Sequence, residues 1–132
     1  MIEDTRERFL RAIAERLDAA RVEEVHLFPA LRQGGTESAV AVIAVHRVPD
    51  DAPVSEPARL TVYRAHYRLV LKGPERGTWE VGVTEEADAP PLTVGKVVRG
   101  VHERSGGDDE PERLGGDAFR AAVVGEPWTA AP

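Results

Sequence analysis

Three side chains able to bind an anion alternate along one predicted strand. Arg64, His66 and Arg68 occupy every second position of the stretch RLTVYRAHYRLVLK, residues 59–72. Alternate residues of a strand lie on one face about 6.6–7 Å apart, so these donors would form a basic stripe. Arginine can hold a carboxylate or phosphate in bidentate fashion. The alternative is an exposed face whose charges pair with acids such as Glu80 on a neighbouring strand, an ordinary feature of sheets.

Three histidines are the candidates for a metal site. His26, His46 and His66 are spaced twenty residues apart, and each lies in a predicted strand. Three imidazoles with an open fourth position can bind zinc. The spacing contains neither HxH nor HExxH, and the guanidinium groups of Arg64 and Arg68 beside His66 disfavour a bound cation. We therefore expect unliganded histidines, no metal and no cofactor.

Other catalytic motifs are not found in the sequence. The stretch GKVVRG, residues 95–100, has lysine after its first glycine, whereas a phosphate-binding loop needs GxxxxGK followed by Ser or Thr. Neither Ser38 nor Ser55 lies in a GxSxG context, and the acids of residues 108–112 lack the ligand pattern of a calcium loop. These observations favour a protein without catalysis of its own, and we name no catalytic residue.

The strand at residues 39–48 (AVAVIAVHRV) is the centre of the predicted fold. It is apolar in both alternating registers through Val45, which is typical of a strand covered on both faces. Strands are also predicted at residues 25–31, 59–72 and 78–84. Pro29 lies inside the first of them and cannot donate to a sheet, so we expect that strand at an edge or bulged at the proline.

Turns and helices complete the prediction. Glycines at residues 34–35 and 73–77 favour two hairpin turns, and three prolines in residues 49–57 favour a surface loop. Phe9, Leu10, Ile13 and Leu17 recur at helical spacing, which predicts an amphipathic helix over residues 4–20. Residues 93–104 fit a second helix or a fifth strand, and residues 117–124 a short helix or an edge strand.

Together these elements predict one α+β domain over residues 1–132. An N-terminal helix packs on a four-stranded, or five-stranded, antiparallel meander, with a second helix near residues 93–104. Residues 105–116 are expected to form an acidic, Gly-rich loop, and residues 126–132 a loose tail. The N-terminal helix can cover only one face of the central strand. The segment after Thr93 or a second copy of the chain must therefore cover the other face.

Composition excludes several classes of partner and site. The 132 residues include 17 basic and 23 acidic side chains, and the net charge of −6 argues against nucleic acid as a partner. There is no cysteine, so disulfides and thiolate metal sites are excluded. The charged N-terminal stretch is unlike a secretory signal, and no apolar run approaches the roughly 20 residues of a membrane helix. We expect a cytoplasmic protein without membrane contact.

The sequence therefore predicts a small, non-catalytic cytoplasmic interaction module that binds a protein or peptide partner. We expect a homodimer, because an apolar sheet face left open would be an association surface. A chaperone-, adaptor- or immunity-like role would suit its size and acidity. The alternative is a small-molecule or anion-binding domain, or an enzyme, that uses the basic face of Arg64, His66 and Arg68.

Overall fold

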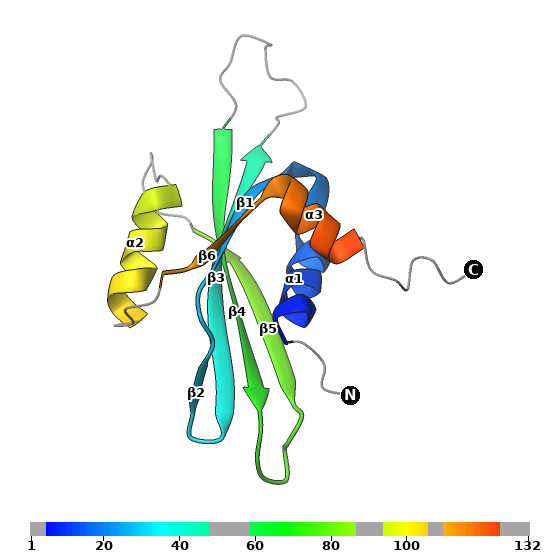
Figure 1. Ribbon diagram of the computed structural model, residues 1–132, viewed down its shortest axis with the longest axis vertical. Coiled ribbons are helices and arrows are strands. Elements are labelled where there is room, and N and C mark those ends of the chain that lie inside the picture. The colour runs from blue at the N-terminus through cyan, green and yellow to red at the C-terminus, as the bar shows by residue number, and fades with distance from the viewer. Residues whose placement is uncertain (1–4, 48–58, 87–93, 106–109, 125–132) are drawn as a thin grey trace, which may run out of the picture.

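The computed structural model describes residues 5–47, 59–86, 94–105 and 110–124, which form an antiparallel sheet with helices on both faces (Figure 1). The predicted loop at residues 49–57 and the predicted tail at residues 126–132 lie outside the described residues. The α+β class and the N-terminal helix followed by strands are confirmed. The elements are α1 (Thr5–Arg16), a 3-10 helix η1 (Ala19–Arg21), β1 (Val22–Leu27), β2 (Leu31–Gln33), β3 (Thr36–Arg47), β4 (Arg59–Val70), β5 (Trp79–Glu85), α2 (Val94–Ser105), β6 (Glu112–Gly115) and α3 (Gly116–Val124).

The sheet has six strands in the described part of the chain, more than the four or five predicted. Its order is β5-β4-β3-β1-β6, and the short strand β2 also pairs with β3. All pairings are antiparallel, and the twelve-residue strands β3 and β4 pair along their whole length. The strand β3 is therefore central, as the doubly apolar pattern of the predicted strand indicated.

Two hydrophobic clusters cover the two faces of β3. On one face Ala41 and Ile43 pack with buried residues of α1 and α3, such as Phe9 and Phe119. On the other face Val42, which is fully buried, packs with Val62 of β4 and with residues 97 and 101 of α2. Figure 1 shows α2 on the side of the sheet opposite α1 and α3. The segment after Thr93 thus covers the second face, and no second copy is needed for that purpose.

The first strand differs from its prediction. β1 ends at Leu27, before Pro29, and lies between β3 and β6 rather than at an edge. Its irregularity is a register shift between Val22 and Glu24, not a bulge at the proline. The predicted glycine turn exists, with positive φ at Gly34 and Gly35, but it joins β2 to β3.

The structure tests three predictions for the C-terminal part of the chain. The acidic stretch at residues 105–116 was expected to be a loop, which is wrong for its last residues, because β6 pairs with β1. Residues 106–109 lie outside the described part. The second helix predicted near residues 93–104 is α2, which begins at Val94, and the segment at residues 117–124, predicted as a helix or an edge strand, is in α3. No described helix is both long and apolar enough to cross a membrane.

Candidate functional site

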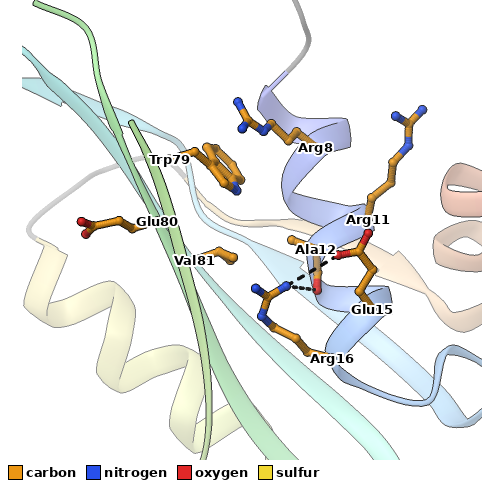
Figure 2. A pocket seen from close by; sticks show the side chains of 8 residues that line it. All are labelled: Arg8, Arg11, Ala12, Glu15, Arg16, Trp79, Glu80 and Val81. Carbon is orange, nitrogen blue, oxygen red and sulfur yellow. Dashed lines mark hydrogen bonds and ion pairs between the residues drawn. The ribbon is translucent and has the colours of Figure 1, made fainter. Parts of the chain in front are cut away.

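An open groove of about 580 Å³ lies between α1 and β5, and we call it the α1–β5 groove (Figure 2). In Figure 2, Trp79 and Val81 project from β5 toward α1, whereas Glu80 projects to the other side of the strand. This alternation follows from the two-residue period of a strand. The lining residues are Arg8, Arg11, Ala12, Glu15 and Arg16 of α1 and Trp79, Glu80 and Val81 of β5.

Two arginines of α1 lie on the side of the helix that faces the groove. Residues four apart on a helix share a face. Arg8, Ala12 and Arg16 have this spacing. The guanidinium carbon of Arg8 lies 4.2 Å from the centroid of the Trp79 ring, which is cation–π geometry. Arg16 donates from Nη1 to the carbonyl oxygen of Ala12 at 3.1 Å and lies 3.8 Å from the Glu15 carboxylate. These contacts orient both guanidinium groups at the groove.

A row of three aromatic rings connects the groove to the hydrophobic core. The Trp79 ring stacks on Tyr67 with centroids 4.8 Å apart, and Tyr67 meets Phe9 edge-on at 4.9 Å. Burial is the largest effect that raises the pKa of Tyr67, to about 12, and the Glu37 carboxylate that accepts its hydroxyl hydrogen bond at 2.9 Å adds to it. Trp79 therefore packs against a buried, hydrogen-bonded tyrosine.

The strand β5 is an edge of the sheet, since it pairs only with β4 in the described part of the chain. Glu86 donates its backbone N–H to Val62 at 2.9 Å, and Thr78 accepts one from Val70 at 3.0 Å. Hydrogen-bonded pairs alternate in an antiparallel ladder, so the even-numbered residues between them face β4. The backbone groups of the odd-numbered residues consequently point outward: Trp79, Val81, Val83 and Glu85.

This edge lacks several of the features that usually protect an exposed strand, although it carries the charges of Glu80 and Glu85. Residues 79–85 contain no proline and no lysine, and the pairing of β4 with β5 is regular. The edge strand β6 has four residues and β2 has three, which limits what they can pair with. Among the described edges, β5 therefore offers the longest run of outward-pointing backbone groups.

The helix α1 runs alongside β5. A second hollow, of about 390 Å³, shows where the C-terminal end of this helix lies. Arg16 lines this hollow together with Tyr63 and Glu85, and it also lines the α1–β5 groove together with Val81. Arg8 is level with Trp79 at the other end of the strand. The two arginines are thus spaced along the open edge.

The predicted basic stripe lies on the opposite face, the one that α2 partly covers. Arg64 forms an ion pair with Glu86 at 2.8 Å, and Arg68 lies directly opposite Glu80 in the ladder. The His66 ring lies over a glycine of β5, since a Cβ added at position 82 would come within 2.6 Å of its Cε1 atom. The three side chains do share one face, and anion binding there stays a prediction.

The three candidate metal histidines lie at different levels of the sheet. His26 pairs with Val42 in the ladder, four residues from His46 on β3, a separation of about 13 Å along the strand. His66 lies opposite Val40, further from His46 still. Across residues 5–47, 59–86, 94–105 and 110–124, no group of three or more His, Asp or Glu side chains is arranged to hold a metal ion.

Two of these histidines are instead partners of carboxylates. His46 contacts the carboxylate of Glu23, and Nε2 of His26 lies 3.3 Å from Oε1 of Glu24. Arg113 of β6 also bonds Glu24, from Nε at 2.9 Å. Burial alone would raise the pKa of Glu24, but the bonds from Arg113 and His26 outweigh it and lower that pKa. This charged cluster joins β6 to β1.

Neither the α1–β5 groove nor the edge was singled out in the sequence. The available signal was the position of β5 as the last strand of a predicted meander, with Trp79, Val81 and Val83 on one side. Searches with the chain against protein-family models, curated proteins and solved structures found no match.

Proposed function

We propose that this protein is a non-catalytic interaction module that binds a protein or peptide partner by adding an extended segment of that partner to the edge of β5. The observation that supports this proposal is the row of outward-pointing backbone groups on β5 beside the α1–β5 groove. In strand addition, backbone hydrogen bonds supply affinity, and the pockets for alternate side chains supply specificity.

The groove offers chemistry suited to binding. Its lining presents guanidinium groups, the face of an indole and backbone donors and acceptors. An incoming strand paired with β5 would direct every second side chain toward α1, into the groove. The cytoplasmic location and the lack of catalysis expected from the sequence stay predictions.

The sequence predicted a homodimer because a second copy could cover the open apolar face of β3. In the structure α2 covers that face, so this argument for a dimer no longer applies. A homodimer stays a prediction from the sequence, and no described surface is assigned to it. Sedimentation of the purified chain at micromolar concentration tests it: a dimer would support self-association, and a strictly monomeric species would contradict it.

Substitution of Val81 by proline tests strand addition. The Val81 N–H points away from β4, so Val81→Pro removes an outward donor without breaking the β4–β5 ladder. Peptides selected on the wild-type protein from a displayed random library should lose at least tenfold in affinity for this variant. Its circular dichroism should remain that of the folded chain. The matched control, Val81→Thr, keeps the N–H and changes only the side chain, so it should lose much less affinity than Val81→Pro.

Two results of this experiment would contradict the proposal. Selected peptides that bind the folded Val81→Pro variant as tightly as the wild type do not use the β5 edge. A selection that yields no binding peptide would equally argue against a peptide-binding edge.

A further inference from the structure

We infer that the segment bound at β5 is acidic, with carboxylates at two α1-facing positions four residues apart and an apolar residue midway between them. This inference deepens the proposed function and rests on it, since it names the chemistry of the partner. It follows from the spacing of the arginines on α1, from the apolar residues of β5 between them, and from the poor fit of a second copy.

The spacing of the two arginines matches a strand. Arg8 and Arg16 are eight residues apart on α1, which corresponds to about 12 Å along a helix axis. Residues i and i+4 of a strand are about 13.5 Å apart and lie on the same face. With Arg8 level with Trp79, and Arg16 between Val81 and Glu85, two carboxylates at that spacing meet one arginine each.

The midway position meets an apolar surface. Between the two arginines the groove is lined by Ala12 of α1 and Val81 of β5, both of which have aliphatic side chains. A residue of an incoming strand that lies opposite Val81 would face them, since directly opposed side chains in a ladder are neighbours. A valine or isoleucine there would bury apolar surface mainly against Val81, since Ala12 is already only 6% exposed.

The charge of the groove also favours carboxylates. Besides Arg8 and Arg16, α1 contributes Arg11 to the lining and a single acid, Glu15. Glu80 lies on the other side of β5 (Figure 2). The α1 side of the groove is therefore basic at Arg8, whereas Arg16 has the acids Asp18 and Glu85 beside it in the neighbouring hollow. Attraction between exposed charges weakens as salt is added, so this binding should be salt-sensitive.

A second copy of the chain fits the same edge less well. Full antiparallel overlap of two β5 strands would place Gly82 opposite its equivalent and would run the two α1 helices in opposite directions across the seam. Trp79 would then lie opposite Glu85 of the second copy, which is favourable. Arg8 would, however, approach Arg16 of the second copy, and this would happen twice by symmetry. Opposed like charges destabilise such a pairing.

The test uses the full ¹⁵N-labelled chain and a synthetic probe, acetyl-Thr-Glu-Thr-Val-Thr-Glu-Thr-amide, followed by amide chemical shifts. Its glutamates at the second and sixth positions and its valine at the fourth share one strand face. The control peptide has glutamine in place of both glutamates. Arg8→Gln and Arg16→Gln each remove one groove charge, and Arg99→Gln removes a charge from the exposed surface of α2 on the other side of the sheet.

The acidic probe should shift the amides of residues 79–85 and bind three- to fivefold more weakly for each charge removed, from either the peptide or the groove. Arg99→Gln should leave binding unchanged. The two peptides could instead bind equally well at β5, with no effect of Arg8→Gln or Arg16→Gln. This result would overturn the acidic specificity but would leave strand addition at β5 supported. Amide shifts of β5 could also change with protein concentration when no peptide is present. This result would identify a second copy of the chain as the occupant of the edge, and it would overturn the inferred acidic partner. No β5 shift with either peptide would contradict strand addition itself.

Discussion

Glu37 is a carboxylate buried where β3 begins beneath the N-terminus of α1. Its residue surface is 3% exposed, and it accepts hydrogen bonds at 2.9 Å from Nε of Arg32 and from the hydroxyl of Tyr67. Burial works to raise the pKa of Glu37, but bonds from Arg32, Tyr67 and Thr5 overcome that effect and lower it. A buried charge is tolerated when it is paired and hydrogen-bonded in this way. This network ties α1, β2, β3 and β4 together.

Glu37→Gln should destabilise the protein by about 1–3 kcal/mol at pH 7, because it removes a paired buried charge. The pKa of Glu37 is lower in the folded protein than its ordinary value of 4.5, so the unfolded chain takes up its proton first as the pH falls. The stabilisation is fully present above about pH 4.5 and is lost as the pH falls through the lowered folded pKa. The difference between variant and wild type should therefore shrink as the pH falls below about 4.5.

Urea unfolding of both proteins at pH 7 and pH 3.5 measures this difference. Glu103→Gln, at an exposed site on α2, is the control and should have little effect at either pH. A difference between Glu37→Gln and the wild type that does not change with pH would contradict the assigned role of the carboxylate.

At the scale of elements, the parts predicted correctly are those with a local pattern. The doubly apolar run in β3, the helical repeat of Phe9, Leu10 and Ile13, and the paired glycines before Thr36 each depend on neighbouring residues only. β6 has no such pattern, because it is four residues long within an acidic stretch. It is a strand because the outer edge of β1 can pair with it and because Arg113 bonds Glu24. Such long-range pairing has no local signature.

Gly116 shows how closely α3 approaches β1. A Cβ at this position would lie 2.2 Å from the backbone oxygen of Val22, which also accepts a hydrogen bond from Arg120 at 3.0 Å. Backbone cannot rotate aside as a side-chain tip can, so Gly116→Ala should cost about 2–3 kcal/mol through overpacking.

The neighbouring glycine supplies the control for that substitution. A Cβ at Gly115 would meet nothing within 4 Å, so Gly115→Ala should change the free energy of unfolding by less than about 0.5 kcal/mol. Urea unfolding at pH 7 measures both variants. Equal effects of the two substitutions would show that the contact between α3 and β1 is not as close as described.

At the scale of the whole molecule, helices cover both faces of the sheet while the edge of β5 stays open in the described part of the chain. The covering of two faces was predictable from the residues of β3, although the choice between α2 and a second copy was not. The α1–β5 groove was not predictable, because Arg8 and Arg16 are more than sixty residues from Trp79 in sequence. Only the tertiary arrangement brings them together.

The most direct test of the central claim is residue-level amide hydrogen exchange with and without a bound peptide. In the free protein, the amides of Trp79, Val81 and Val83 should exchange fast because they point outward, while those of Glu80, Gly82 and Thr84 are protected by β4. A peptide selected on the wild-type chain should protect the first group and leave the second unchanged. Protection confined instead to the face of Arg64, His66 and Arg68 would contradict strand addition at β5.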